Sequence, residues 1–490
     1  MNNRREFIKA IAIAGSGALI ARRAFGNTII DLNDPALSSF SSKQDAWAQV
    51  PGILKRIKRP VFPKRDFHLS RYGASGDGQA DCSNAFRDAI AACSKAGGGR
   101  VVVPVGSFLT GAIHLQNNVN LHVSSGATIK FQQDPKRYLP VVFTRWEGME
   151  LLNYSPFIYA FEQENIAITG QGTLDGQANS EAWWPWNGRT QYGWRGGDPN
   201  QRKARGLLVE MIERDVPVSE RVFGGGHYLR PQFIQPYRCK NVLIEGVTIK
   251  NSPMWEIHPV LCQNVTVQRV KISSHGPNND GCDPESCTDV LIKDCYFDTG
   301  DDCIAIKSGR NADGRRLNAP TENVIIQGCQ MKDGHGGITV GSEISGGVRN
   351  LFAENCHLDS PNLDHALRVK NNAMRGGLLE NFYFRNIQVG QVAHAAITID
   401  FNYEEGDKGK FIPVVRNFAV RNLKSGKSKY ALDVQGFKHA PIFNLSLEDC
   451  IFENVAAASI VKNVEGLKLR NVHINGKLVE EIKPADKSAS

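Results

Sequence analysis

After its N-terminus the sequence lacks any apolar run long enough to cross a bilayer, so it predicts no membrane span in the mature chain. It also lacks a strong excess of charge. The net charge is +8, and the first 26 residues hold five basic residues against one acidic, which leaves about +4 (8 − 4) for the remainder. This small, dispersed excess argues against nucleic-acid binding. There is no Cys-x-x-Cys pair, and we expect no metal and no cofactor.

The N-terminus has the composition of an export signal. Arg4-Arg5 precedes an apolar stretch at 10–21, and small residues follow at 24–26. Residues 1–26 are therefore predicted to be a twin-arginine signal peptide, which implies a bacterial periplasmic or extracellular protein. An amphipathic N-terminal helix is the alternative, but the segment has no polar face and is interrupted by glycine at 15–17.

The chain has 11 cysteines, an odd number, so at least one stays unpaired even under oxidising conditions. Cys239, Cys262 and Cys287 each stand two residues before an Asn or Asp. This regular spacing indicates small side chains stacked in a core rather than a disulfide framework.

One phrase recurs from about residue 110 onward: a turn residue, usually Asn, followed by three to five alternating apolar residues. It begins at Asn165, Asn241, Asn264, Asp289, Asn323, Asn350, Asn381, Asn417 and Asn444. The steps from Asn241 onward are 23, 25, 34, 27, 31, 36 and 27 residues. A constant phrase with irregular steps is typical of a solenoid whose coils carry loop insertions.

These strands predict an all-β protein, a right-handed parallel β-helix over residues 61–476. No helical segment is evident between successive strands, which argues against a βαβ fold, and the regular blade period of a β-propeller is absent. Residues 27–60 are expected to be a polar lead-in and residues 477–490 a flexible tail.

Two segments depart from the coil pattern. Residues 83–96 have one apolar helical face and end at Gly97-Gly98-Gly99, so we expect a short helix that caps the N-terminal end of the stack. Residues 176–229 contain no coil phrase and are rich in Trp and Gly, which predicts a long loop insertion. Its aromatic residues are expected to stack on sugar rings, or alternatively to form a small core that only holds the loop.

Acidic residues occur where two consecutive coils turn from loop into strand. Asp280 lies 21 positions before Asp301 (301 − 280), about one coil, and Asp302 follows directly. Coils stack at about 4.8 Å, so three carboxylates there could not all ionise and one proton would be retained. An acid beside a base is what cleavage of a glycosidic bond requires. A lone Asp-Asp pair more often belongs to a turn, but the presence of Asp280 one coil away favours a catalytic site.

Three further residues lie in the coils that follow. His335 stands between two glycines, where the backbone can approach a ligand closely. Arg368 and Lys370 are two apart on a predicted strand and so project from one face. They either neutralise the acids or hold a carboxylate of the substrate, and we favour the second interpretation because the acids are needed for catalysis.

The acidic residues, His335 and the two basic residues lie in four short motifs. In chain order these are Asn278-Asn279-Asp280, Asp301-Asp302, Gly334-His335-Gly336 and Arg368-Val369-Lys370. In this order the chain resembles the polygalacturonases of glycoside hydrolase family 28, whose motifs are Asn-Thr-Asp, Asp-Asp, Gly-His-Gly and Arg-Ile-Lys. The two departures, Thr to Asn and Ile to Val, leave every charged group in place. Longer phrases around 252–260, 276–281 and 308–310 are similar to bacterial exo-acting members.

The resemblance implies an enzyme that hydrolyses α-1,4-galacturonosidic bonds of pectic homogalacturonan from the non-reducing end, with inversion. It implies that Asp301 is the general acid and that Asp280 with Asp302 activates water. It implies substrate positioning by the residues His335, Arg368, Lys370, His258, Lys307 and Arg310. An endo-polygalacturonase or a rhamnogalacturonan-type hydrolase remains open, as do, from other classes, a calcium-dependent pectate lyase and a non-catalytic β-helix adhesin.

Overall fold

The computed structural model describes residues 45–482, in two units, 1–48 and 49–490. The predicted signal peptide and most of the predicted tail lie outside the described residues. Within the described part no helix is both long and apolar enough to cross a membrane. All the strands found in residues 45–482 belong to the second unit.

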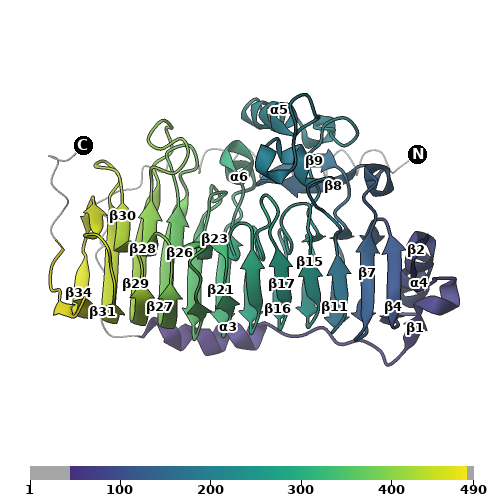
Figure 1. Cartoon of the computed structure of the whole chain (residues 1–490), viewed down its shortest axis with the longest axis horizontal. Coiled ribbons are helices and arrows are strands. Elements are labelled where there is room, and N and C mark those ends of the chain that lie inside the picture. Colours follow the sequence, from purple (N-terminus) through teal and green to yellow (C-terminus); the bar gives the residue numbers. More distant parts are fainter. Residues whose placement is uncertain (1–44, 483–490) are drawn as a thin grey trace, which may run out of the picture. The chain divides into compact units, whose positions relative to one another are not determined.

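Residues 49–482 form the predicted parallel β-helix, in which successive coils add strands to three parallel stacks (Figure 1). The first stack consists of β1 (Asp66–His68), β3 (Gly99–Val103), β6 (Val119–Val123), β11 (Glu164–Gly170), β14 (Lys240–Glu245), β16 (Gln263–Gln268), β18 (Thr288–Lys293), β21 (Thr321–Gln327), β24 (Val348–Glu354), β27 (Leu378–Gln391), β29 (Val414–Lys427), β31 (Ile442–Phe452) and β34 (Lys468–Ile474).

The second stack consists of β2 (Asp77–Asp81), β4 (Gly106–Thr110), β7 (Ala127–Phe131), β12 (Thr173–Asp175), β15 (Thr248–Lys250), β17 (Lys271–Ser274), β19 (Tyr296–Thr299), β22 (Gln330–Met331) and β25 (His357–Leu358). The third consists of β5 (Ile113–His114), β10 (Ile158–Phe161), β13 (Ile234–Tyr237), β20 (Ile304–Ile306), β23 (Gly334–Val340), β26 (Leu363–Lys370), β28 (Ala395–Asp400), β30 (Tyr430–Gln435) and β32 (Ile460–Lys462). Single bridges through Ile257 and Cys282 connect β13 with β20.

The recurring Asn residues explain the regularity of the first stack. Each lies near the start of its strand and has a positive φ, for example 60° at Asn350. Their amides bond from coil to coil: Asn350 Nδ2 donates to Asn323 Oδ1 and Asn381 Nδ2 donates to Asn350 Oδ1, both at 3.1 Å. Asn tolerates this left-handed conformation better than most residues, so one side chain supplies both the turn and the bond.

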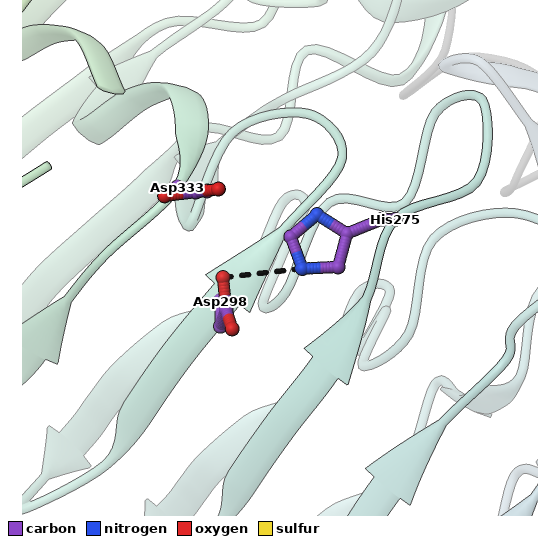
Figure 2. A group of neighbouring side chains, drawn as sticks. All are labelled: His275, Asp298 and Asp333. Carbon is purple, nitrogen blue, oxygen red and sulfur yellow. Dashed lines mark ion pairs between the residues drawn. The ribbon is translucent and has the colours of Figure 1, made fainter. Parts of the chain in front are cut away.

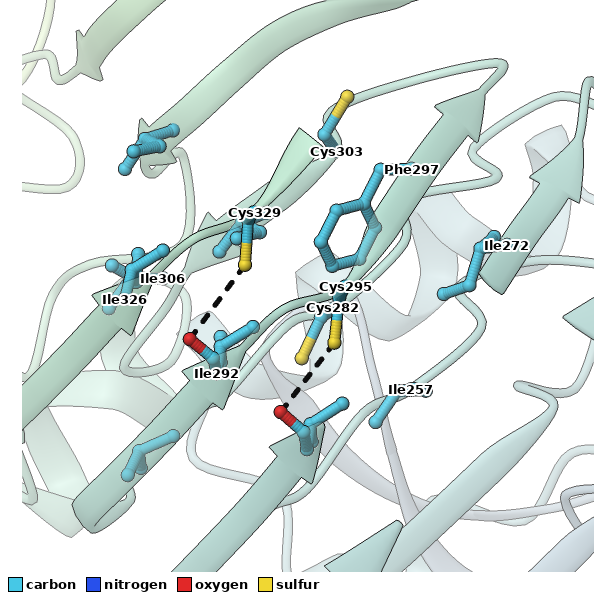
Figure 3. Close-up of a cluster of buried hydrophobic side chains, with 14 of the residues drawn as sticks. Ile257, Ile272, Cys282, Ile292, Cys295, Phe297, Cys303, Ile306, Ile326 and Cys329 are labelled. Carbon is cyan, nitrogen blue, oxygen red and sulfur yellow. Dashed lines mark hydrogen bonds between the residues drawn. The ribbon is translucent and has the colours of Figure 1, made fainter. Parts of the chain in front are cut away.

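The cysteines are buried and stacked, as the spacing predicted. The backbone N–H of Cys239 points at Cys262 Sγ, and that of Cys262 at Cys287 Sγ, each at 3.4 Å. All eleven cysteines are free and buried. Figure 3 shows Cys295 and Cys329 among isoleucine side chains, their thiols directed at backbone carbonyl oxygens of the preceding coil.

The predicted capping helix is α4 (Ser83–Lys95), which packs against β1 and β3 at one end of the stack (Figure 1). Its buried face is that expected from the sequence: Ala85, Phe86, Ala89, Ile90 and Cys93. A second short helix, α6 (Asn311–Leu317), stands between β20 and β21. The expectation that no helix separates successive strands was wrong here, because seven residues are too few to show a helical period in the sequence.

Residues 176–229 contain no strand and leave the stack as a long loop with four helical segments. These are η4 (Trp184–Asn187), η5 (Thr190–Tyr192), α5 (Arg202–Glu213) and η6 (Val218–Glu220). In Figure 1, α5 lies over the antiparallel hairpin of β8 (Val142–Trp146) and β9 (Met149–Asn153). Trp183 is 2% exposed and packs on Tyr138 and Phe157. Trp183 therefore belongs to a small aromatic core that holds the loop, which is the alternative to stacking on sugar rings.

The segment before the first coil also contacts the stack. Helix α3 (Val50–Arg56) lies along the first stack in Figure 1, within the interval expected to be a polar lead-in. Arg56 forms two hydrogen bonds with the Asp289 carboxylate, at 3.0 and 2.8 Å. Lys58 and Asn264 exchange two further bonds, at 3.0 and 2.7 Å.

Candidate active site

The structure brings the three predicted carboxylates together. Asp280 follows β17, and Asp301 and Asp302 lie between β19 and β20. The bridge from Cys282 to Ile304 places Asp280 beside Asp302 on adjacent coils. Oxygens of the three side chains lie within 4.8 Å of one another. The trio can therefore share protons and act on one bound group.

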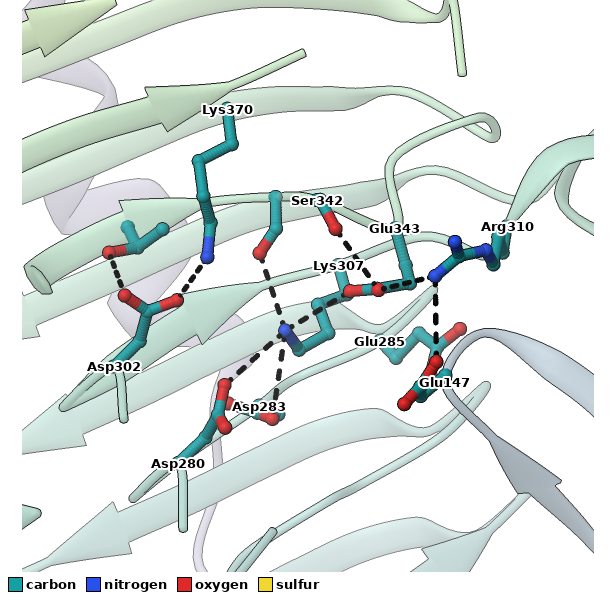
Figure 4. Close-up of polar contacts among 12 residues, drawn as sticks. Glu147, Asp280, Asp283, Glu285, Asp302, Lys307, Arg310, Ser342, Glu343 and Lys370 are labelled. Carbon is teal, nitrogen blue, oxygen red and sulfur yellow. Dashed lines mark hydrogen bonds and ion pairs between the residues drawn. The ribbon is translucent and has the colours of Figure 1, made fainter. Parts of the chain in front are cut away.

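Arg368 and Lys370 project from β26 toward this trio, as their spacing predicted. Lys370 Nζ lies 2.5 Å from Asp302 Oδ2 (Figure 4). Arg368 Nη1 lies 3.8 Å from Asp302 Oδ1. Thr339 Oγ1 donates a third contact to Asp302, at 3.1 Å. Asp302 is thus fully buried, ionically paired and fixed in orientation, while the partly exposed Arg368 keeps capacity for another anion.

His335 pairs with Asp301 at the more exposed side of the trio, with Nδ1 3.0 Å from Oδ1. The hydrogen bond and charge of Asp301 raise the pKa of His335 to about 9. Burial alone would raise the pKa of Asp301, but the hydrogen bond and charge of His335 outweigh it and hold that pKa below its usual range. At neutral pH the two form an imidazolium–carboxylate pair.

Asp280 has the opposite electrostatic environment. It is 3% exposed, its Oδ1 has no hydrogen-bond partner among the described residues, and Lys307 Nζ is 3.5 Å from its Oδ2. Burial first, and the charge of Asp301 next, raise the pKa of Asp280 well above its usual range. Of the trio, Asp280 is therefore the carboxyl whose environment most favours the protonated form.

Lys307 and Arg310 lie behind the trio in a buried ionic network (Figure 4). Lys307 Nζ is 3.2 Å from Glu343 Oε2, and Arg310 is 3.5 Å from Glu343 Oε1 and 3.5 Å from Glu147 Oε2. Burial opposes ionisation of Glu343, but the charges of Lys307 and Arg310 hold its pKa below its usual range. With 2% and 3% exposure, both basic residues are occupied by protein carboxylates.

His258 is placed away from the cleft surface. It is fully buried, with Nε2 2.7 Å from Glu285 Oε2 and Nδ1 3.0 Å from Gln235 Nε2. Burial above all lowers the pKa of His258. Both ring nitrogens are engaged, so of the predicted residues this one is not brought to a position where it contacts a ligand.

The sequence interpretation missed several acidic residues of this network. Glu343 follows the Gly341-Ser342 pair that extends the Gly-His-Gly motif, and that adjacency was a usable signal. Glu147 lies at the turn of the β8–β9 hairpin, with a positive φ of 44°, and joins Arg310 to Arg205 of α5. Nothing in its sequence surroundings indicated this, because its partners are more than 50 residues away.

The insertion of residues 176–229 is attached to the loop that carries Asp280. Trp184 Nε1 donates to Ser252 O at 2.8 Å. Arg230, directly after the insertion, is fully buried and donates to Pro253 O at 2.7 Å, Pro277 O at 2.6 Å and Asn278 Oδ1 at 2.7 Å. The insertion therefore borders the acid trio on one side.

A parallel β-helix with a carboxylate trio, one member of which has a raised pKa, and adjacent cations has the composition of a glycoside hydrolase site. The family described as glycosyl hydrolases family 28 has a sequence model that matches residues 225–473, or 249 of the 490 residues (473 − 225 + 1). The chain belongs to this family and is a glycosidase.

Solved structures and characterised relatives agree with this membership. The chain is 49% identical to a hyperthermoactive exopolygalacturonase from Thermotoga maritima, with a TM-score of 0.86 over 89% of this chain and 97% of that one. It is 28% identical to a probable polygalacturonase of Vitis vinifera, covering 81% of this chain and 77% of the relative. It is 25% identical to an exo-poly-alpha-D-galacturonosidase of Dickeya chrysanthemi, covering 80% and 67%.

Proposed function

We propose that this glycosidase hydrolyses the α-1,4-galacturonosidic bonds of pectic homogalacturonan from the non-reducing end and releases galacturonic acid. The observation that carries the proposal is the meeting of Asp280, Asp301 and Asp302 within 4.8 Å beside Arg368 and Lys370. Acid and base groups for cleavage thus stand next to cations suited to a sugar carboxylate. The likeness to an exopolygalacturonase at 49% identity supports the substrate and the exo mode.

In this proposal Asp301 protonates the leaving oxygen while Asp280 and Asp302 activate the attacking water. Asp301 suits the donor role by position, because its side chain is 17% exposed and those of Asp280 and Asp302 are 4% and 0% exposed. In the free protein, however, the pKa of Asp280 is raised and that of Asp301 is lowered. The proposal therefore requires that bound substrate reverses this order, between carboxylates whose oxygens lie within 4.8 Å of one another.

Galacturonosyl fluoride tests the role of each carboxylate, because fluoride leaves without protonation. We expect Asp301→Asn to lose nearly all activity on polygalacturonate but to retain much of it on the fluoride. Asp280→Asn should fail on both substrates. The reverse pattern would assign the acid role to Asp280, whose pKa is raised in the free protein.

The type of reaction and the substrate are tested by the first products formed. The proposal predicts galacturonic acid from polygalacturonate, none from rhamnogalacturonan, and NMR detection of the β-anomer before mutarotation. A calcium-dependent lyase would instead give an ultraviolet-absorbing unsaturated product that a chelator abolishes. Oligomers as the first products would indicate an endo-polygalacturonase.

The insertion is our candidate for the closed end of an exo-acting cleft. Two contacts support this: Asn187 of the insertion donates to Asn278 Oδ1 at 3.4 Å, and Arg230, directly after it, donates to Pro277 O at 2.6 Å. Shortening residues 189–200, which connect η4 and α5, should shift the products from monomer toward oligomers. If such a variant folds and still releases only monomer, the closed end lies elsewhere.

Export by the twin-arginine route is proposed from residues 1–26 alone. Replacing Arg4 and Arg5 together by Lys should leave the protein in the bacterial cytoplasm, and unchanged export would contradict the proposal.

A further inference from the structure

We propose that His275, Asp298 and Asp333 form a binding site for one divalent transition-metal ion, with Zn²⁺ as its probe. His275 directly follows β17, Asp298 lies on β19, and Asp333 precedes β23. The three side chains come from three successive coils and converge on one point (Figure 2). One ligand atom from each lies within 4.8 Å of the other two.

The contact between His275 and Asp298 has the geometry of two ligands rather than of a hydrogen bond. Nε2 of His275 lies 3.1 Å from Oδ1 of Asp298. This oxygen is buried, yet it accepts no hydrogen bond from the described residues. In a tetrahedral zinc site with bonds of 2.0–2.1 Å, neighbouring ligand atoms are roughly 3.3 Å apart. An ion between the two atoms would satisfy the buried oxygen that the imidazole leaves without a hydrogen bond.

Asp333 is held in place by neutral donors. Ser360 Oγ donates to its Oδ1 at 2.5 Å, and Asn362 Nδ2 donates to its Oδ2 at 3.2 Å. Donors of this kind orient a ligating carboxylate without cancelling its charge. With a neutral imidazole, the site carries two negative charges, which matches a divalent cation.

The ligand types favour one class of ion. A nitrogen with two carboxylate oxygens suits Zn²⁺ or Mn²⁺, whereas Ca²⁺ takes oxygen ligands. The His275 side chain is 48% exposed, so water can reach the ion and complete its coordination.

The site adjoins the catalytic pair through the backbone. Asp298 precedes Asp301 by three residues, and Asp333 precedes His335 by two. Between them, the Thr299 N–H donates to Asp333 O at 3.0 Å, and Thr299 Oγ1 donates to Asp301 O at 2.8 Å. A bound ion would therefore connect three coils directly beside Asp301, which is proposed to protonate the substrate, and its partner His335.

Calorimetric titration of the metal-stripped, full-length protein with ZnCl₂ tests the proposal. We expect one equivalent of Zn²⁺ to bind, at least tenfold more tightly than Ca²⁺, and to raise the melting temperature. His275→Ala and Asp298→Asn should each weaken binding at least tenfold. His439→Ala is the matched control and should leave it unchanged, because His439 faces Asp407 at 3.4 Å in a comparable exposed His–Asp pair. Asp280→Asn should also leave it unchanged.

Three results would overturn the proposal. Wild-type protein that takes up no Zn²⁺ would leave His275 and Asp298 as a simple ion pair. Binding that survives in both His275→Ala and Asp298→Asn would place the ion elsewhere on the surface. Binding lost in Asp280→Asn, with folding intact by circular dichroism, would place it in the acid trio instead.

Discussion

Lys370 and Asp302 form a buried ion pair at the base of the acid trio, with side chains 7% and 0% exposed. Lys370→Met keeps the volume but leaves the Asp302 carboxylate without its ammonium, so we expect a loss of about 3–5 kcal/mol of unfolding free energy. Urea unfolding measures this loss. Adding Asp302→Asn should restore part of it, because the stranded charge is removed.

The control for that pair is Arg87→Met, because Arg87 and Asp88 form an exposed ion pair with side chains 66% and 53% exposed. Its loss should change the stability by no more than about 1 kcal/mol. A comparable effect of the two substitutions would mean that burial adds nothing to the Lys370–Asp302 pair.

Glu256 is a buried carboxyl that the proposed mechanism does not use. It is fully buried and neither of its oxygens has a hydrogen-bond partner among the described residues. Burial above all, with the charge of Asp280 adding to it, raises the pKa of Glu256 well above its usual range. An acid whose folded pKa is raised favours the folded state below its unfolded pKa of about 4.3. That contribution is lost as the pH rises toward the folded pKa.

Glu256→Gln removes this titration. Relative to wild type, the variant should therefore gain stability between pH 4 and pH 8, by about 1.4 kcal/mol for each pH unit until the folded pKa is reached. Urea unfolding across this range measures the difference, with the exposed Glu181→Gln as control. Parallel pH profiles for wild type and Glu256→Gln would show that Glu256 is ionised in the fold.

At the scale of single elements, the Asn ladder combines a turn conformation with bonds between coils. Asn350→Gly keeps the positive φ of 60° and loses two bonds, so it should cost about 1–3 kcal/mol. Asn350→Ala also forces a side chain with Cβ into that conformation, which should cost about 1–2 kcal/mol more. Urea unfolding separates the two costs.

Asn318→Gly serves as the comparison for the ladder. Asn318 has a φ of 46° at the end of α6, outside the ladder, and its replacement should change the stability by less than about 0.5 kcal/mol. Equal costs for Asn350→Gly and Asn350→Ala would show that the left-handed turn contributes nothing. If Asn350→Gly leaves the free energy of unfolding unchanged, the two hydrogen bonds between coils contribute nothing to stability.

The elements that could be predicted are those in which each coil repeats the same local requirement. Asn at the turn, alternating apolar residues and a small buried cysteine all recur, so they identified the stack and placed Asp280 beside Asp301-Asp302. The β8–β9 hairpin, α6 and α3 occur once each. Their conformations depend on distant partners, as Arg56 does on Asp289 and Glu147 on Arg310, and no local pattern encodes these contacts.

Across the whole molecule, the site residues also divide into those that a motif could place and those whose surroundings depend on distant partners. The motifs predicted that the three acids, Arg368 and Lys370 lie close together, and the structure brings them together. Residues at equivalent positions of consecutive coils lie side by side in a β-helix. The motifs gave no information on burial, so Lys307, Arg310 and His258 were expected beside substrate, whereas the structure places them in a buried layer. The opposite pKa shifts of Asp280 and Asp301 were also beyond sequence reasoning, since they depend on which carboxylate faces His335.

The insertion and the β-helix meet at Arg230, whose guanidinium is the subject of the last prediction. Arg230→Met leaves the carbonyl oxygens of Pro253 and Pro277 buried and without this donor, at about 1–3 kcal/mol each. The loop that holds Asp280 and the end of the insertion then lose their common anchor. We expect kcat/KM on galacturonate oligomers to fall at least tenfold and some oligomer to appear among the products.

Steady-state kinetics and product analysis, at a temperature where circular dichroism shows the variant to be folded, separate these effects from simple destabilisation. Arg195→Met, an exposed position in the same insertion, should behave as wild type. A folded Arg230→Met enzyme with a lowered melting temperature but unchanged kcat/KM and products would limit Arg230 to stability. In that case the anchoring of the insertion to the Asp280 loop would have no part in catalysis.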